Sequence, residues 1–286
     1  MKNIFLIGTG LIGGSILKDL RNHYPESTLY GIDKNPEHAL KAKSNKIIDH
    51  VAQIEDVKDA QLVIVSIPVD VALKVLPQVL DLVNEDALVI DVGSTKEAIC
   101  KSVEEHKNRR QFLAAHPIAG TEFSGPDAAI HDLFKNKTMI VCEVEKTAFK
   151  LQESAIALFE KLKMRVRYMT PAAHDKHIAY VSHLSHISSF MLGKTVIQEE
   201  VNERDIFDLA GSGFESTVRL AKSSPAMWTP IFAQNKEHVL ASLDGYIENL
   251  SRFRESVKNN DHNAIFKDME QTNRIKTILK GIENGK

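Results

Sequence analysis

The chain has 286 residues, enough for one large domain or two ordinary ones, and its 43% hydrophobic and 26% charged residues are typical of a globular protein. The formal net charge of −2 gives no general attraction to nucleic acid or to an anionic membrane, and no apolar stretch is long enough to cross a bilayer. The two cysteines, Cys100 and Cys142, have neither a disulfide-framework nor a metal-site spacing and no signal peptide is recognisable, so we expect a cytoplasmic protein.

The first predicted elements surround a glycine-rich turn. An apolar run over residues 4–7 predicts a strand, residues 8–13 have the pattern G-x-G-x-x-G, and residues 12–20 predict a helix. A second strand is predicted over 28–32, and Asp33 follows it, twenty residues after the last of the three glycines. A lone glycine motif is weak evidence, but strand, turn, helix, strand and acid in this order predict a dinucleotide-binding unit.

Each residue of this unit has its own physical role. Gly8 permits the tight turn, Gly10 lets the backbone approach a pyrophosphate, and Gly13 lets helix and strand pack closely. Asp33 would accept hydrogen bonds from the ribose and repel the extra phosphate of NADP, so we predict NAD, although the neighbouring Lys34 leaves NADP open. The alternative is a glycine turn that binds nothing. The residues expected to contact the cofactor are Gly8, Gly10, Leu11, Ile12, Gly13, Asp33, Ser66 and Pro68.

Strand and helix patterns then alternate as far as residue 169. Strands are predicted over 62–66, 88–91, 112–115, 139–142 and 166–168, and helices over 70–82, 96–105 and 148–162. Short apolar strands separated by helices are typical of a mostly parallel sheet that helices cover on both faces. The fold class predicted for residues 1–169 is therefore a Rossmann-type, doubly wound α/β domain.

Beyond Thr170 the pattern becomes helical. Helices are predicted over 172–200, 235–257 and 262–282, with almost no strand signal, and Pro171 suits the first turn of a helix. We therefore expect a second, all-helical domain over residues 170–286 that completes the substrate site. Its apolar faces are too extensive for the domain to bury alone, which predicts a homodimer; the alternative is that the first domain covers them.

Three segments follow predicted strands of the sheet, at the edge where ligands of such folds bind. They are 66–69, 91–96 and 116–121. His116 stands out because a histidine held at a strand end by a proline and a glycine-containing loop is well placed to transfer a proton near neutral pH. An ordinary loop histidine is the alternative.

The helical part offers further polar residues. His174, His177, His183 and His186 form two pairs spaced three apart, but no H-E-x-x-H pattern or cysteine partner accompanies them, so no metal site is predicted. Arg219 follows a glycine-rich turn and could bind a carboxylate through two nitrogens of its guanidinium group, although an arginine in this position is more often a surface residue.

Six spaced motifs run through nearly the whole chain. They are the turn at 8–13, D-x-G-S-x-K at 91–96, H-P-x-A-G-T at 116–121 with S-G at 124–125, S-H-L-S-H at 182–186, G-S-G-F at 211–214, and 219–228. This set closely resembles the prephenate dehydrogenase family of tyrosine biosynthesis, which includes arogenate dehydrogenases. Two departures bear on local backbone and substrate preference: Ser185 stands where many members have proline, and Ser212 interrupts the glycine triplet.

The resemblance implies an NAD-dependent oxidative decarboxylation of prephenate to 4-hydroxyphenylpyruvate. In it His116 matches the catalytic histidine, and Ser94 matches a serine that hydrogen-bonds near the same substrate hydroxyl. Arg219 matches the arginine that binds a substrate carboxylate. The other residues that the resemblance places in the substrate pocket are His186, Ser182, Thr121 and Trp228, although Trp228 could equally be a packing residue.

Other functions remain open on the sequence alone. Arogenate differs from prephenate only in its side chain, which the motifs do not distinguish. A β-hydroxyacid dehydrogenase shares the domain plan, but the Lys-x-x-x-Asn pattern that it needs on a long helix occurs only at Lys280–Asn284. A non-enzymatic sensor of NAD(H) would need the glycine turn and Asp33, but not His116, Ser94 and Arg219 together.

Overall fold

The structure, a computed structural model, describes residues 1–283. The chain forms two compact units, Met1–Val239 and Leu240–Lys286. No helix in residues 1–283 combines the length and apolar character needed to cross a membrane. All of the predicted site residues belong to the first unit.

The first unit is built on one sheet, in which the described residues form eight strands in the order β3-β2-β1-β4-β5-β6-β7-β8. All neighbours pair in parallel except β6 and β7, which are antiparallel. The strands are β1 Asn3–Ile7, β2 Thr28–Ile32, β3 His50–Val51, β4 Leu62–Val65, β5 Leu88–Asp91, β6 Phe112–Pro117, β7 Thr138–Cys142 and β8 Arg165–Met169. The predicted mostly parallel α/β fold is confirmed, and only β3 has no counterpart among the predicted strands.

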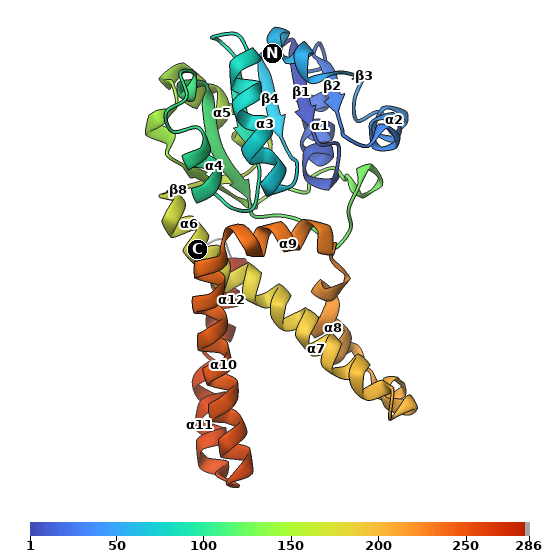
Figure 1. Cartoon of the computed structure of the whole chain (residues 1–286), viewed down its shortest axis with the longest axis vertical. Coiled ribbons are helices and arrows are strands. Elements are labelled where there is room, and N and C mark those ends of the chain that lie inside the picture. The colour runs from blue at the N-terminus through green and yellow to red at the C-terminus, as the bar shows by residue number, and fades with distance from the viewer. Residues whose placement is uncertain (284–286) are drawn as a thin grey trace. The chain divides into compact units, whose positions relative to one another are not determined.

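Helices cover both faces of this sheet (Figure 1). They are α1 Leu11–His23, α2 Pro36–Ser44, α3 Val69–Leu82, α4 Glu97–Ser102 and α5 Phe149–Lys161. In β1, Ile4 and Leu6 point into one apolar core and Phe5 and Ile7 into the other, because successive side chains of a strand alternate between its faces. This explains why the buried strands appear in the sequence as continuous apolar runs.

A second group of helices completes the first unit. It comprises α6 Pro171–Ile178, a π-helical turn at Ala179–His183, α7 Leu184–Glu200, α8 Ser212–Val218 and α9 Pro225–Gln234. The Thr170 hydroxyl caps α6 by accepting a hydrogen bond from the N–H of Ala173 at 3.2 Å. The single helix expected over 172–200 is therefore interrupted by the π-turn. α9 packs on the start of α3 through Trp228, Ile231 and Val69 (Figure 1).

Short 3-10 turns connect these elements at Ile54–Asp59, Arg109–Gln111, Pro126–Ala128, Val144–Lys146, Arg204–Leu209 and Arg219–Lys222. The helix α10, Lys236–Lys258, begins in the first unit and continues into the second, which also contains α11 His262–Thr272 and α12 Ile275–Glu283. The helix expected over 262–282 is broken at Asn273 and Arg274, which form a turn. Of the Lys280–Asn284 pattern, Lys280 lies in α12 and Asn284 lies outside the described residues.

Candidate active site

The glycine turn joins β1 to α1 at the carboxyl edge of the sheet. Gly8 has a φ of +94°, and a Cβ at this position would lie 2.2 Å from the carbonyl oxygen of Ser66, so only glycine fits. A Cβ added at Gly10 would meet no atom within 4 Å, which leaves the surface over the start of α1 open. An open backbone surface at a helix N-terminus is what a dinucleotide pyrophosphate requires.

The other predicted cofactor residues gather around this turn. Leu11, Ile12 and Gly13 form the first turn of α1, whose N-cap, Gly10, supplies no side-chain hydrogen bond. The N–H of Ser66 donates to the carbonyl of Ile7 at 2.7 Å, which holds the end of β4 beside the end of β1. Pro68 is the N-cap residue of α3. The ends of two neighbouring strands thus bring these residues together.

Asp33 is held at the end of β2 by three hydrogen bonds. Its Oδ2 accepts from the N–H and the hydroxyl of Thr9 at 2.9 and 2.8 Å, and its Oδ1 accepts from the N–H of Asn35 at 2.9 Å. These contacts orient the carboxylate and leave a lone pair free on Oδ1, which accepts only one of the three bonds. Among residues 1–283, the one basic side chain recorded within ion-pair distance of it is His38, with Nδ1 3.9 Å from Oδ1.

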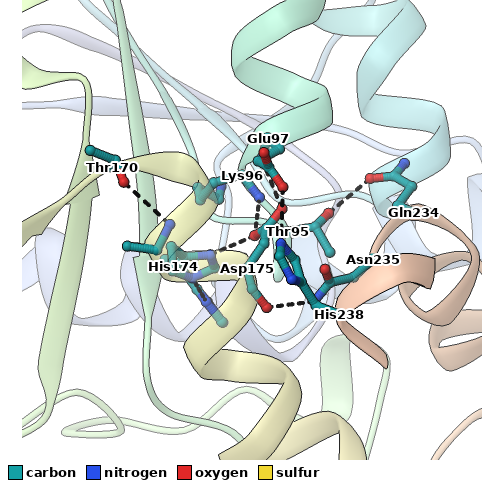
Figure 2. Close-up of polar contacts among 12 residues, drawn as sticks. Thr95, Lys96, Glu97, Thr170, His174, Asp175, Gln234, Asn235 and His238 are labelled. Atoms are coloured by element: carbon teal, nitrogen blue, oxygen red, sulfur yellow. Dashed lines mark hydrogen bonds and ion pairs between the residues drawn. The ribbon is translucent and has the colours of Figure 1, made fainter. Parts of the chain in front are cut away.

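His116, near the end of β6, begins a row of three side chains. Its Nδ1 lies 2.8 Å from Nε2 of His174, and Nδ1 of His174 lies 2.7 Å from Oδ1 of Asp175. Asp175 also accepts hydrogen bonds from the backbone N–H groups of Lys96 and Glu97 at 2.8 and 2.9 Å. Figure 2 shows how these contacts join α6 to the start of α4. His174 and Asp175 are both 2% exposed, whereas His116 is half-buried.

Both histidines of the row are neutral near pH 7. Burial holds the pKa of His116 well below 6.5, and the nearby His174, Lys96 and His183 lower it further. Burial also lowers the pKa of His174, although its hydrogen bond to Asp175 opposes this change. A neutral imidazole can accept a proton, so His116 has the charge state that a general base needs.

The side chain of Lys96 is fully buried. Its ammonium group pairs with Asp91 and donates to the carbonyl of Ala115 at 2.8 Å, which joins the ends of β5 and β6 beside His116. Burial raises the pKa of Asp91, while the ammonium group of Lys96 and the N–H groups of Gly93 and Ala115 oppose this rise. The pair therefore holds the end of β5 against the residue that precedes His116 in β6.

Ser94 lies in the loop between β5 and α4 and is half-buried. Within residues 1–283, its hydroxyl has no recorded hydrogen-bond partner, so it is free to bind a ligand. The neighbouring Thr95 ties this loop to α9, because its hydroxyl donates to Oε1 of Gln234 at 2.8 Å (Figure 2). Ser94 therefore lies on a loop that is held in place, and its hydroxyl group is available to bind a ligand.

Arg219 reaches the loop that follows His116. Its Nη1 lies 3.0 Å from Oε2 of Glu122, and half of the Arg219 side chain is exposed. Thr121 lies in the same loop, where its hydroxyl accepts from the N–H of Phe123 at 3.3 Å. The guanidinium group is therefore placed over this loop with nitrogens left to bind an anion.

His186 and Trp228 form a stacked pair between α7 and α9. Their ring centroids lie 3.6 Å apart with an interplanar angle of 28°. Nδ1 of His186 donates to the carbonyl of Ser182 at 3.0 Å, so Nε2 of the neutral ring is an acceptor. Trp228 is 7% exposed, and Ser182 lies in the π-turn one residue before His183, which also contacts the Trp228 ring.

Several groups that build this site had no predicted role. They are Lys96, Glu122, His174, Asp175 and Asn235, whose amide donates to the carbonyl of Asp175 at 2.7 Å (Figure 2). Lys96 belongs to one of the six motifs, and the histidine spacing offers His174 only as a candidate metal ligand. In the structure His174 instead bonds to His116 and Asp175. A histidine followed by an aspartate at the start of a helix was the available signal.

Two family models match the chain. The prephenate dehydrogenase nucleotide-binding domain matches residues 16–168, and the prephenate dehydrogenase dimerization domain matches residues 170–271. Prephenate dehydrogenase of Bacillus subtilis strain 168 is 32% identical over 272 residues, which cover 92% of this chain and 72% of that protein.

Solved structures of prephenate and arogenate dehydrogenases also resemble this chain over nearly its whole length. Prephenate dehydrogenase from Aquifex aeolicus, in complex with hydroxyphenyl propionate and NAD+, superposes with a TM-score of 0.89 at 32% identity and 98% coverage of both chains. Arogenate dehydrogenase from Synechocystis superposes with a TM-score of 0.77 at 26% identity, covering 97% of this chain and 99% of that one.

Proposed function

The chain belongs to the prephenate dehydrogenase family, and from this we propose that it oxidises prephenate with NAD+ to 4-hydroxyphenylpyruvate, carbon dioxide and NADH. The observation that carries the proposal is the position of His116. A neutral imidazole lies at the end of β6, on the sheet edge that also carries the glycine turn and the Ser94 loop. Ligands of open α/β sheets bind at this edge.

The residues of the first strands fit NAD. The open backbone over Gly10 and the N-terminus of α1 would hold the pyrophosphate, and the oriented carboxylate of Asp33 would accept from the ribose hydroxyls. When bound, NAD+ supplies the hydride acceptor. The chain must then orient the substrate, bind its two negative charges and manage one proton.

His116 accepts and later returns that proton. Nε2 takes it from the ring hydroxyl as the carbon that bears this group loses hydride, and the hydroxyl of Ser94 hydrogen-bonds to the same oxygen. Loss of carbon dioxide leaves its electron pair in the ring, which becomes an aromatic phenolate. His116 returns the proton to this oxygen, so the complete reaction releases none. Aromatisation makes the step strongly favourable.

The substrate carboxylates need partners of opposite charge or hydrogen-bond donors. Arg219 binds one of them with the guanidinium nitrogens that Glu122 does not occupy. His186 and Ser182 line the pocket from the start of α7, Thr121 from the loop after β6, and Trp228 closes it from α9. The stacking of Trp228 on His186 keeps that wall rigid.

Residues 1–169 serve as the nucleotide-binding domain and residues 170–286 as the substrate and dimerisation domain. The homodimer is supported by the match to a dimerization-domain model and by large apolar side chains that α7 and its C-cap leave exposed. Those side chains are Met191, Leu192, Ile197 and Val201. Their burial against a second copy would remove an exposed apolar face.

The test is NADH formation with prephenate and with arogenate side by side, each repeated with NADP+. The proposal requires a much higher kcat/KM for prephenate with NAD+. A preference for arogenate would favour the second candidate, which the likeness to the Synechocystis enzyme supports. His116→Asn should lower kcat about 10²- to 10⁴-fold through loss of proton transfer, and near-normal turnover in that variant would exclude His116 as the base.

A further inference from the structure

A row of hydrogen bonds runs from the proposed base into the interior. Asp175 lies at its inner end, His174 in the middle and His116 at the outer end, with heavy-atom separations of 2.7 and 2.8 Å. The ring planes of the two histidines are inclined by 68°. Because each imidazole nitrogen either donates or accepts, the state of the inner end determines the state of the outer end.

Asp175 can only accept in this row. Its Oδ1 already receives the N–H of Lys96 and its Oδ2 that of Glu97, and neither backbone group can do anything but donate (Figure 2). Burial raises the pKa of Asp175, but hydrogen bonds from His174 and Glu97 outweigh it, so this pKa lies below its ordinary value. The carboxylate is ionised, and Nδ1 of His174 must therefore be the donor.

The proton positions of both rings follow. A neutral His174 that carries its proton on Nδ1 has a lone pair on Nε2, and it can pair with His116 only if Nδ1 of His116 donates. The opposite arrangement would place two lone pairs 2.8 Å apart, facing each other. The remaining nitrogen of His116, Nε2, has no recorded partner in residues 1–283.

The row also connects His116 to a negative charge, which the other groups around it do not supply. Lys96 of the β5–α4 loop and His183 of the π-turn both lower the pKa of His116, as does His174 of α6. Asp91 is already paired with Lys96. The row that ends at Asp175 is thus the hydrogen-bonded route by which a negative charge stabilises His116 once it has taken up a proton.

We propose that Asp175, acting through His174, keeps the proton of His116 on Nδ1 and so presents Nε2 to the substrate as the base. His174 and Asp175 are positioning residues, since neither contacts the reacting atoms. The inference rests on the proposed function and adds to it two residues 58 and 59 positions away from His116 in the sequence.

A pair of amide variants separates this role from simple support of the fold. His174→Gln carries its terminal amide about as far as Nε2 of histidine. Asp175 attracts the NH₂ group, which leaves the amide oxygen to accept from His116. His174→Asn reaches only the position of Nδ1, so it keeps the contact with Asp175 and loses the contact with His116. If His174 served only to hold Asp175 and α4 in place, His174→Asn would be at least as active as His174→Gln.

We expect the reverse order. His174→Asn should lose about 10- to 100-fold in kcat for NADH formation from prephenate, and His174→Gln should lose several-fold less. The Kd of NAD+ should be unchanged in both, which verifies that each variant is folded. Nitrogen NMR of labelled histidines, assigned with His116→Asn, should show His116 protonated on Nδ1 in the wild type and in His174→Gln, but partly on Nε2 in His174→Asn.

Equal turnover in the two variants, or a His116 proton that stays wholly on Nδ1 in His174→Asn, would overturn the proposal. The nitrogen spectra need no substrate. If the enzyme formed no NADH from prephenate, the proposed function would fail while these spectra would still decide where the proton of His116 lies.

Discussion

Replacing Lys96 by methionine should destabilise the protein strongly, because it leaves a buried carboxylate without its partner. Lys96 is fully buried and Asp91 is 2% exposed. The substitution removes both the ammonium charge and the hydrogen bond to the carbonyl of Ala115. Breaking a buried ion pair by removal of one partner costs about 3–5 kcal/mol in the free energy of unfolding.

The pH dependence of this loss gives the argument a second check. Burial already raises the pKa of Asp91, and without Lys96 the folded-state pKa rises further above its unfolded value. A raised folded pKa contributes stability that is present at low pH and lost as pH rises through that pKa. The difference in free energy of unfolding between Lys96→Met and the wild type should therefore shrink as pH is lowered, by at most about 1.4 kcal/mol per pH unit.

Urea unfolding at several pH values between about 5 and 8 measures both effects. Lys101→Met is the matched control, because Lys101 is exposed on α4, and it should change the free energy of unfolding by less than about 0.5 kcal/mol. Combining Lys96→Met with Asp91→Asn should recover much of the loss, since no buried charge remains. A Lys96→Met protein within about 1 kcal/mol of wild type at pH 8 would refute the reasoning.

Three further predictions concern the active site. Arg219→Ala should raise the KM for prephenate about 10- to 100-fold with a smaller effect on kcat, because a charged hydrogen-bonding partner is lost; an unchanged KM in steady-state assays would make Arg219 a surface residue. Asp33→Ala should lower the ratio of kcat/KM for NAD+ to that for NADP+ at least about tenfold, and a constant ratio would mean that other groups select the cofactor. The profile of kcat/KM against pH should stay flat through pH 6.5 and fall only at lower pH, because burial holds the pKa of His116 well below 6.5; a fall centred at or above 6.5 would contradict that environment.

The fold was predictable wherever local pattern and burial agree. The glycine turn, Asp33, β4, β5, β6 and β7 follow from apolar runs and turn residues that are adjacent in the sequence. The predicted strand at 166–168 also forms, as part of β8, although most of its side chains are exposed. β3 was missed because a strand of two residues is too short to show an alternation of apolar and polar side chains. α2 was missed because it buries only Ala39 and Ala42, which is too few residues for a helical apolar pattern. The reversed direction of β7 was equally hidden, because a buried strand has the same composition in either direction.

The site was predictable only in part. His116 was identified by its position after a predicted strand. His174 was not connected with it, because that contact joins residues 58 positions apart and depends on how α6 meets the sheet. Lys96 illustrates a related difficulty, since a lysine in a loop is ordinarily exposed and only the folded structure shows its burial.

The π-turn at Ala179–His183 determines where the length of this segment can change. A π-turn holds one residue more than an α-helical turn, and it absorbs that residue locally. A deletion within α6 or α7 would rotate every later side chain by about 100° and separate His186 from Trp228. A deletion of one residue within the π-turn would instead leave a regular α-helix and keep α7 in the same register. The residue removed could be one that lines the proposed pocket, such as Ser182. Single-residue deletions among relatives should therefore concentrate in these five residues.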